Sequence, residues 1–272
     1  MGVVKIAVCF KAVPDFDRVV EADWENFSLA GDLGYVQRIL GCFDESALET
    51  ALRLGSAWAE EGKTVETAAL TAAPLPSPLV KTLFAAGFDR VADLSGLLRG
   101  GPEFRPRQTA ALLGAWLTSW GFDLILAGRQ AGWADSGLVP LLLGETLGIP
   151  VITEAETLAP CPGGIEVRRL NGTRREELRA SLPLLITLGN SPVAALRAVT
   201  LGARMAVSQR QAEKPEPEAF PGLGLSEEFP GPPRFIRETR SKTCRFLPGG
   251  EDLPQSLAEA GALLGLKPGE KP

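Results

Sequence analysis

Short apolar stretches alternate with amphipathic segments over the first 150 residues, and this alternation limits the folds that the chain can adopt. Residues 3–10 form a nearly continuous apolar run, as expected of a strand that is covered on both faces. From residue 44 onward, apolar side chains recur at helical spacing. This apolar stripe comprises Ala47, Leu48, Ala51, Leu52, Leu54 and Trp58. Strands that alternate with helices in this way predict crossover connections and an open, mostly parallel sheet.

The predicted elements continue in the same order. Asp44 is the expected N-cap of the first helix, and Gly62 is expected to end it. Pro106 suits the first turn of a later helix, because proline is tolerated where the backbone N–H has no partner within the helix. Further strands are expected over residues 64–72, 90–94 and 122–127, and a further helix over residues 79–86. The segment 16–41 is expected to be a loop or a small hairpin.

The pattern changes after Pro150. Four short strands are expected, over residues 151–158, 165–170, 176–182 and 184–188. Asn171 and Gly172 form a strong hairpin signal between two of these strands. We therefore expect antiparallel hairpin strands added to a Rossmann-like α/β core, so that the fold class is α/β.

The last quarter of the chain has a different character. Residues 211–233 are rich in proline and glutamate, which predicts an extended arm without a core of its own. A short strand over residues 234–246 and a short helix over residues 254–266 are expected to follow. The predicted organisation is an α/β domain over residues 1–210 and an extended C-terminal arm with these two elements over residues 211–272.

Composition excludes several kinds of chemistry. The chain has 272 residues and a net charge of −5, which argues against the concentrated basic surface that a nucleic-acid binder needs. It has no histidine, and its four cysteines form no C-x-x-C pair. A metal site of the usual zinc or iron–sulfur type is therefore not expected, nor is a Ser-His or Cys-His nucleophile. Any reaction must depend on carboxylates, lysine, arginine or a bound cofactor.

The beginning of the chain does not resemble a targeting segment. Its apolar run is shorter than that of a signal peptide, and no apolar stretch approaches the roughly 20 residues that cross a bilayer. We therefore expect a cytoplasmic protein with no membrane insertion.

The loop over residues 128–137 contains unusual chemistry for a turn. It follows an expected strand, precedes an apolar helix and contains an arginine, a serine and three glycines. In an open α/β sheet, ligands bind beyond the carboxyl ends of the strands, and helix N-termini favour anions. The loop is therefore a candidate phosphate site, with Arg129 as a charge-assisted donor. A structural turn with Asp135 or Ser136 as the helix cap is an equally good interpretation of these residues.

Four ordered motifs resemble the beta subunit of electron transfer flavoprotein, and together they cover most of residues 1–205. The motifs are CFKAVPD at 9–15, FDESALETALRL at 43–54, GRQAGWADSGLV at 128–139 and LGIPVIT at 147–153. The resemblance implies a heterodimer with an alpha subunit that holds most of an FAD, to which the beta subunit contributes. It also implies AMP or a second FAD in a site of the beta subunit, and electron exchange with a flavin-dependent dehydrogenase. Such a chain is an electron carrier and has no catalytic residues of its own.

The resemblance also implies the residues of the nucleotide site. By matching positions, the site comprises Cys9, Val13, Cys42, Phe43, Asp44, Ala72, Gly128, Arg129, Gln130, Ala131, Trp133, Asp135, Ser136, Gly137 and Val139. Three of the family's polar positions differ here. Gly41 and Cys42 replace an Asn-Pro pair, Trp133 replaces an aspartate and Leu138 replaces a glutamine. Trp133 is expected either to stack on a bound ring or to plug the pocket.

A further departure concerns partner recognition. In the family, a loop that follows the last strand docks into dehydrogenases through a leucine. The corresponding stretch here, over residues 190–205, retains Leu196 but lacks the family's lysines. Leu196 is the candidate docking anchor, and a leucine that only packs in the core is the alternative.

Two other functions use the same fold. An adenine-nucleotide enzyme such as an ATP pyrophosphatase would need a glycine-serine loop after the first strand, where this chain has only Asp15 and Asp17 to offer. A nucleotide-binding sensor module without a redox role is the second alternative. Such modules are shorter and lack the added hairpins and the arm.

Overall fold

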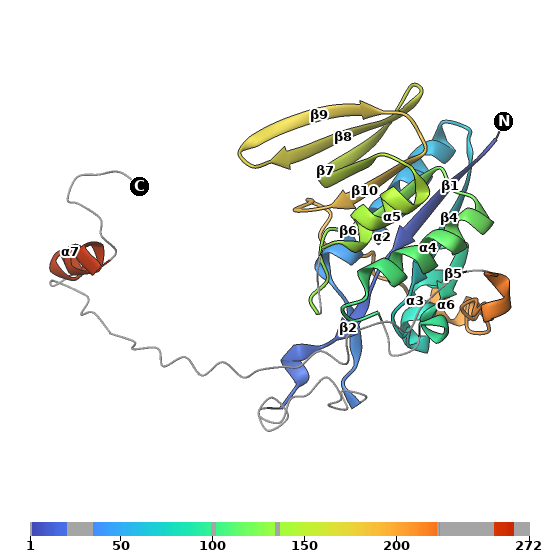
Figure 1. Ribbon diagram of the computed structural model, residues 1–272, viewed down its shortest axis with the longest axis horizontal. Coiled ribbons are helices and arrows are strands. Elements are labelled where there is room, and N and C mark those ends of the chain that lie inside the picture. The colour runs from blue at the N-terminus through green and yellow to red at the C-terminus, as the bar shows by residue number, and fades with distance from the viewer. Residues whose placement is uncertain are drawn as a thin grey trace. The chain divides into compact units, whose positions relative to one another are not determined.

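The computed structural model describes residues 2–20, 35–98, 102–133, 137–221, 223 and 253–263. The chain forms two compact units, residues 1–233 and 234–272. The first unit contains the sheet and the helices that cover it (Figure 1). In the second unit, α7 extends over Leu253–Leu263, and the expected strand over residues 234–246 lies outside the described residues.

An eight-stranded sheet is the centre of the first unit, with the strand order β5-β4-β1-β6-β10-β7-β8-β9. The strands from β5 to β7 are parallel, and β8 and β9 extend the sheet as an antiparallel meander. Their bounds are β1 Val3–Cys9, β4 Thr64–Thr71, β5 Arg90–Asp93, β6 Leu124–Gly128, β7 Val151–Cys161, β8 Gly164–Asn171, β9 Arg174–Ala180 and β10 Leu184–Leu188. The prediction of an α/β fold with a mostly parallel sheet and added hairpin strands is confirmed.

Helices cover both faces of the parallel strands. On one face lie α2 (Cys42–Glu60) and α3 (Ser77–Ala86), and on the other lie α4 (Pro106–Trp120) and α5 (Val139–Leu147). Alternate side chains of β1 enter the two resulting cores. Ile6 and Val8 pack toward α2 and α3, whereas Ala7 and Cys9 pack toward α4 and α5. Because β1 is buried on both faces, its sequence is a continuous apolar run.

The first helix begins earlier than expected. Gly41, in extended conformation, is the N-cap of α2, and its carbonyl accepts the N–H of Glu45 at 2.9 Å. The prediction of Asp44 as the cap is wrong, because Asp44 already lies in the first helical turn and is only 5 % exposed. Gly62 lies just beyond the helix end with a φ of +80°, which agrees with its predicted role as the terminating residue.

Tight turns join the antiparallel strands as predicted. Gly163 and Gly172 have positive φ values in the β7–β8 and β8–β9 turns. The position of β10 was not predicted, because it inserts between β6 and β7 and is parallel to both. Of the segment 16–41, expected to be a loop or a small hairpin, β3 (Arg38–Leu40) pairs antiparallel with β2 (Ala12–Pro14), which precedes the segment, and residues 21–34 lie outside the described part.

The segment after β10 is attached to α2 by one buried carboxylate. Glu49 is 3 % exposed and accepts hydrogen bonds from the backbone N–H, Nε and Nη2 of Arg197 at 3.1, 2.9 and 3.1 Å. Arg53 Nε donates to the same carboxylate at 2.9 Å. A short helix, α6 (Leu201–Ala206), follows and is capped by the Thr200 side chain. The Glu49 interactions therefore fix residues 190–200 on the surface of α2.

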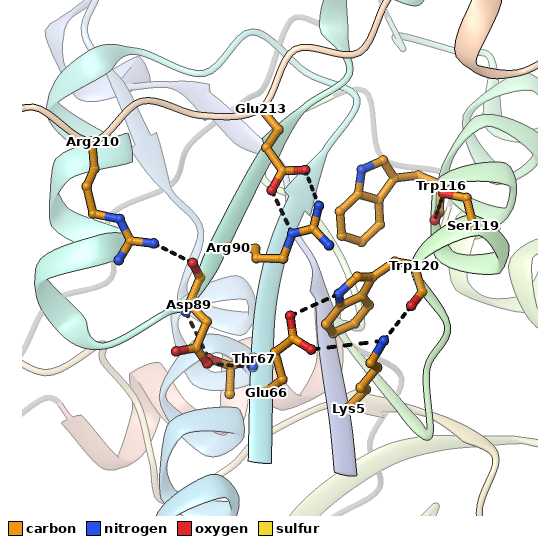
Figure 2. Close-up of polar contacts among 10 residues, drawn as sticks. All are labelled: Lys5, Glu66, Thr67, Asp89, Arg90, Trp116, Ser119, Trp120, Arg210 and Glu213. Carbon is orange, nitrogen blue, oxygen red and sulfur yellow. Dashed lines mark hydrogen bonds and ion pairs between the residues drawn. The ribbon is translucent and has the colours of Figure 1, made fainter. Parts of the chain in front are cut away.

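The beginning of the predicted arm packs on the edge of the sheet. Glu213 exchanges backbone hydrogen bonds with β5, and its carboxylate accepts two hydrogen bonds from Arg90 at 2.6 and 2.8 Å (Figure 2). The Arg90 guanidinium lies 5.5 Å from the ring centroid of Trp116. Phe220 packs against the core on the α4 side. Residues 211–220 thus cover the free edge of β5, while most of the predicted arm lies outside the described residues.

The Glu49 interactions generate a pH-dependent prediction. Burial raises the pKa of Glu49, but the hydrogen bonds from Arg197 and Arg53 outweigh burial and hold the pKa below its ordinary value. A depressed pKa stabilises the fold above the ordinary value and loses this effect as the pH falls through the folded-state pKa. Glu49→Gln is expected to lower the free energy of unfolding by about 1–2 kcal/mol at pH 7, and by less below about pH 4.

Urea denaturation at pH 7 and at about pH 3.5 measures this effect. The matched control is Glu61→Gln, because Glu61 forms an exposed ion pair with Lys63 near the end of the same helix. A loss that is the same at both pH values, or no larger than that of the control, would contradict the stabilising role of Glu49.

Candidate functional site

A cleft opens at the carboxyl ends of β1, β4 and β6. It encloses about 790 Å³ of empty space, including its open mouth, and apolar atoms predominate in its lining. Cys9 at the end of β1, Ala72 after β4 and Gly128 at the end of β6 form its floor. A mostly apolar lining with a few polar groups is typical of small-molecule and cofactor sites.

The topology explains why the cleft lies here. From β1 the chain first builds β4 and β5 on one side, and it then returns to build β6 on the other side. The connections therefore diverge above β1, which is where ligands bind in open parallel sheets. On one side the first turns of α4 and α5 border the cleft, and on the other side Asp44 of α2 does.

The polar groups of the cleft are mainly cationic. Lys11, Arg105 and Arg129 line it, whereas Asp44 is the acidic residue among the described lining residues. Two helix N-termini, with their partial positive charge, border the same space. The cleft therefore favours a ligand that carries negative charge on an apolar body.

Arg129 is held by three contacts. Its guanidinium lies 4.8 Å from the ring centroid of Phe43, and its Nη1 lies 3.6 Å from Glu154 Oε1. Its backbone N–H donates to the carbonyl of Leu188 at 3.0 Å. Glu154 has a φ of +58°, an unusual conformation for a residue with a side chain. Gly189 allows the Glu154 backbone to lie close to it, because a Cβ at Gly189 would lie 3.2 Å from Glu154 Cα.

Trp133 is not among the residues that line the cleft. Its ring lies 5.0 Å from that of Phe16, and Lys11 Nζ donates to its carbonyl at 2.9 Å. The stacking of Trp133 on a bound ring stays a prediction. Trp133 connects the loop after β6 to the segment after β2.

The Cys9 thiol lies in the cleft, but it is not a nucleophile at neutral pH. Burial and, to a lesser extent, the nearby Asp44 carboxylate raise the pKa of Cys9 to about 12. The group therefore stays protonated at neutral pH, and it contributes packing rather than reactivity.

The structure brings most of the predicted nucleotide-site residues together. Nine of them line the cleft: Cys9, Asp44, Ala72, Gly128, Arg129, Gln130, Ala131, Gly137 and Val139. Four described residues lie near the cleft but not in its lining: Val13, Cys42, Phe43 and Trp133. Asp135 and Ser136 lie outside the described residues. Leu138 is the N-cap of α5 and has an extensively exposed side chain.

Sequence reasoning missed the wall formed by α4 and the residue Lys11. Lys11 belongs to the CFKAVPD motif, so its motif could have identified it. For Arg105 and Thr109 the sequence indicates only that a helix begins at Pro106, and it does not indicate that they line a cleft. Their place in the cleft depends on the packing of α4 beside α5, which periodicity does not reveal.

Leu196 lies far along the chain from these residues, and it is half-buried against the core on the α2 side. The large apolar side chains that are most exposed nearby are Leu201 and Met205 of α6, at 74 % and 67 %. Leu201 and Met205 thus form an exposed apolar pair a few residues after Leu196, the predicted docking anchor.

The described residues contain neither a membrane-spanning helix nor a metal-binding cluster. No helix among them is long and apolar enough to span a membrane. Among the same residues, no group of three or more cysteine, aspartate or glutamate side chains is placed to hold a metal ion.

The fold and the cleft define an open α/β protein of Rossmann-like type, and comparison with known proteins identifies the family. The model of the electron transfer flavoprotein domain matches residues 35–219. The chain belongs to the electron transfer flavoprotein family and is related to its beta subunits.

Individual relatives agree with this assignment. The chain is 30 % identical over 190 residues to the electron transfer flavoprotein subunit beta of Megasphaera elsdenii, covering 67 % of each chain. It is 28 % identical over 185 residues to the corresponding subunit of Mycobacterium leprae, covering 67 % of this chain and 68 % of the relative. It is 30 % identical over 185 residues, with 67 % of each chain covered, to the caffeyl-CoA reductase-Etf complex subunit CarD of Acetobacterium woodii.

The floor of the cleft generates a prediction at Gly128. A Cβ there would lie 2.9 Å from the backbone carbon of Phe43 and 3.0 Å from the backbone nitrogen of Asp44. Because backbone atoms must move to admit it, Gly128→Ala is expected to lower the free energy of unfolding by about 1–3 kcal/mol. Thermal unfolding followed by circular dichroism measures this loss.

Gly96→Ala is the matched control, because nothing lies within 4 Å of a Cβ at Gly96. Equal midpoint temperatures of thermal unfolding for Gly128→Ala and Gly96→Ala would contradict the close approach of β6 to the beginning of α2.

Proposed function

We propose that this chain is the beta subunit of an electron transfer flavoprotein, and that its cleft binds an adenine nucleotide. The observation that carries the proposal is the cleft itself. Nine residues that the family resemblance assigns to the nucleotide site line one cavity at the switch point of the sheet. The nine come from separate segments of the chain, and the fold brings them to one cavity.

The phosphate of the nucleotide is proposed to bind at the beginning of α5. The first N–H groups of a helix have no partner within it, and they favour an anion. Gly137, with a φ of +61°, lies at this position and lines the cleft. Arg129 adds a guanidinium whose orientation is fixed by Glu154 and Phe43. The proposed ligand of this site is AMP or the adenylate part of a second FAD.

The electron carrier is proposed to be an FAD that is shared with an alpha subunit. A bound flavin supplies the redox chemistry, and the protein supplies position and field. The Cys9 thiol in the cleft stays protonated at neutral pH, so it adds no nucleophile to the site. The chain is therefore proposed to act as a carrier subunit rather than as a self-contained enzyme, in the cytoplasm.

Residues 211–220 cover the edge of β5, and the rest of the C-terminal arm, which extends to residue 272, is proposed to pack on the alpha subunit. Its described helix α7 exposes Leu253, Leu257 and Leu263, while Ser256 is buried. Three exposed leucines on an eleven-residue helix agree with a segment that is covered in an assembly. An extended arm also covers much surface per residue.

A flavin-dependent dehydrogenase is the proposed electron-exchange partner. CarD is named as a subunit of a reductase complex with an electron transfer flavoprotein, which supports a flavoenzyme as partner. Its proposed docking region is the segment that carries Leu196, Leu201 and Met205. Apolar side chains in a polar rim are the usual anchors of such interfaces.

Coexpression with the alpha subunit tests the proposal. The purified heterodimer is expected to contain flavin, and acid treatment is expected to release an adenine nucleotide. Ser136→Tyr is expected to lower the nucleotide content, because a bulky side chain would occupy the phosphate position. Absorbance and chromatography of the released compounds provide the measurement. A heterodimer without flavin would refute the proposed function, and unchanged nucleotide content in the variant would remove the loop from the site.

The docking region generates a second test. Leu196→Ala is expected to lower the free energy of unfolding by about 1–3 kcal/mol, because Leu196 packs on the core. Leu201→Ala combined with Met205→Ala is expected to change stability by less than about 0.5 kcal/mol, because both side chains are exposed. The double variant should nevertheless slow reduction of the complex by its dehydrogenase. A slow reaction in Leu196→Ala alone, at unchanged stability, would assign docking to Leu196.

A further inference from the structure

The segment between β10 and α6 has little regular structure of its own. Residues 190–200 form neither a helix nor a strand. The backbone N–H of Val193 donates to the Ser191 hydroxyl at 3.1 Å. Among the described residues, no backbone-to-backbone hydrogen bond involves residues 192–199. An irregular segment keeps a single conformation only if other contacts offset its conformational entropy.

Two carboxylates of α2 provide these contacts. Glu49 accepts the backbone N–H, Nε and Nη2 of Arg197 at 3.1, 2.9 and 3.1 Å. Four residues earlier on the helix, the Glu45 carboxylate interacts with the backbone N–H of Leu196. Residues four apart lie on the same face of a helix. One face of α2 therefore holds two successive backbone N–H groups of the segment.

Glu49 acts from the interior and not from the surface. It is only 3 % exposed, whereas the Arg197 side chain is 41 % exposed. Hydrogen bonds to an ionised carboxylate are stronger than neutral ones, and burial shields them from water, so they hold Arg197 more firmly than an exposed ion pair would. A partner that docks on this surface can touch Arg197, but it cannot touch Glu49.

The held segment leads directly into the exposed apolar pair of α6. Arg197 lies four residues before Leu201, which is 74 % exposed, and Met205 is 67 % exposed on the same helix. From the other side, Nη2 of Arg204 donates to the Thr82 hydroxyl of α3 at 3.3 Å. Because so few residues separate Arg197 from α6, release of Arg197 would free the approach to this pair.

We propose that Glu49 is a positioning residue for electron exchange, because it holds Arg197 and thereby keeps α6 in the arrangement that a flavin-dependent dehydrogenase binds. This inference rests on the proposed function, which places dehydrogenase docking on this segment. Preorganisation reduces the ordering that binding requires, and it leaves the electron-transfer step itself unchanged. Its loss should therefore raise the KM of the dehydrogenase for the complex at a constant kcat.

The test uses the flavin-loaded heterodimer and the dehydrogenase that is purified from an extract of the source organism by its ability to reduce that flavin. The rate at increasing concentrations of the complex gives KM and kcat. Glu49→Gln keeps the shape but removes the charge, and it is expected to raise KM about tenfold with kcat within about twofold. Arg197→Gln is expected to act similarly. The double variant should exceed the larger single effect by less than about twofold, because Glu49 acts through Arg197.

Arg53→Gln is the matched control. Arg53 Nε donates to the same carboxylate at 2.9 Å, but it does so from within α2 and not from the docking segment. Its KM is expected to stay within about twofold of the wild-type value. Hydrogen exchange of peptides that cover residues 190–200 gives a second readout, with faster exchange expected in Glu49→Gln and unchanged exchange in Arg53→Gln. Circular dichroism and flavin absorbance verify that each variant is folded and loaded.

Several results would overturn the positioning role while leaving the proposed function intact. These are an unchanged KM in Glu49→Gln, an equal rise in Arg53→Gln, a fall in kcat without a rise in KM, and additive effects in the double variant. If Glu49→Gln does not fold, the comparison of Arg197→Gln with Arg53→Gln decides in the same way. An extract without any dehydrogenase that reduces the wild-type complex would overturn the proposed partner, and the inference with it.

Discussion

The reversal of strand order at β1 is the constraint on which the rest of the structure depends. β1 pairs with β4 on one side and with β6 on the other, and its side chains enter both cores. The connection from β1 to β4 runs through α2 on one face, and the connection into β6 runs through α4 on the other, so that the cleft lies between them. The cleft is thus a consequence of strand order and does not need a dedicated loop. The residues around it can vary while the cavity persists, as the replacements at Cys42, Trp133 and Leu138 illustrate.

Apolar packing and positive charge have different roles in this cleft. The floor is apolar and closely packed, with Gly128 against the backbone of α2 and the Cys9 thiol held protonated. Cationic groups and helix N-termini stand around it, and Arg129 is oriented by partners outside the cavity. An oriented cation binds an anion at lower entropic cost than a free side chain does. The arrangement suits retention of a nucleotide, and the redox chemistry of the family belongs to the flavin.

The sequence predicted the regular parts of this fold and many of the residues that line the cleft. Apolar runs and helical spacing were sufficient for β1, α2 and the hairpin at Gly172, because each depends on local periodicity or turn geometry. The N-cap of α2 was misplaced, since Gly41 caps through its backbone alone and leaves no side-chain signal. The insertion of β10 between β6 and β7, and the position of Thr109 in the cleft, depend on tertiary packing. Motif matching found the loop after β6 because its residues are contiguous, whereas the α4 wall has no contiguous motif.

The central claim is that an adenine nucleotide binds at the carboxyl end of β1, with phosphate at the beginning of α5. A crystal structure of the complex between this chain and its alpha subunit, prepared without nucleotide removal, tests it most directly. We expect electron density for a nucleotide in the cleft, with phosphate oxygens within hydrogen-bond distance of the Gly137 backbone or the Arg129 guanidinium. A nucleotide bound elsewhere on this chain, or a cleft filled by protein side chains in the complex, would contradict the account.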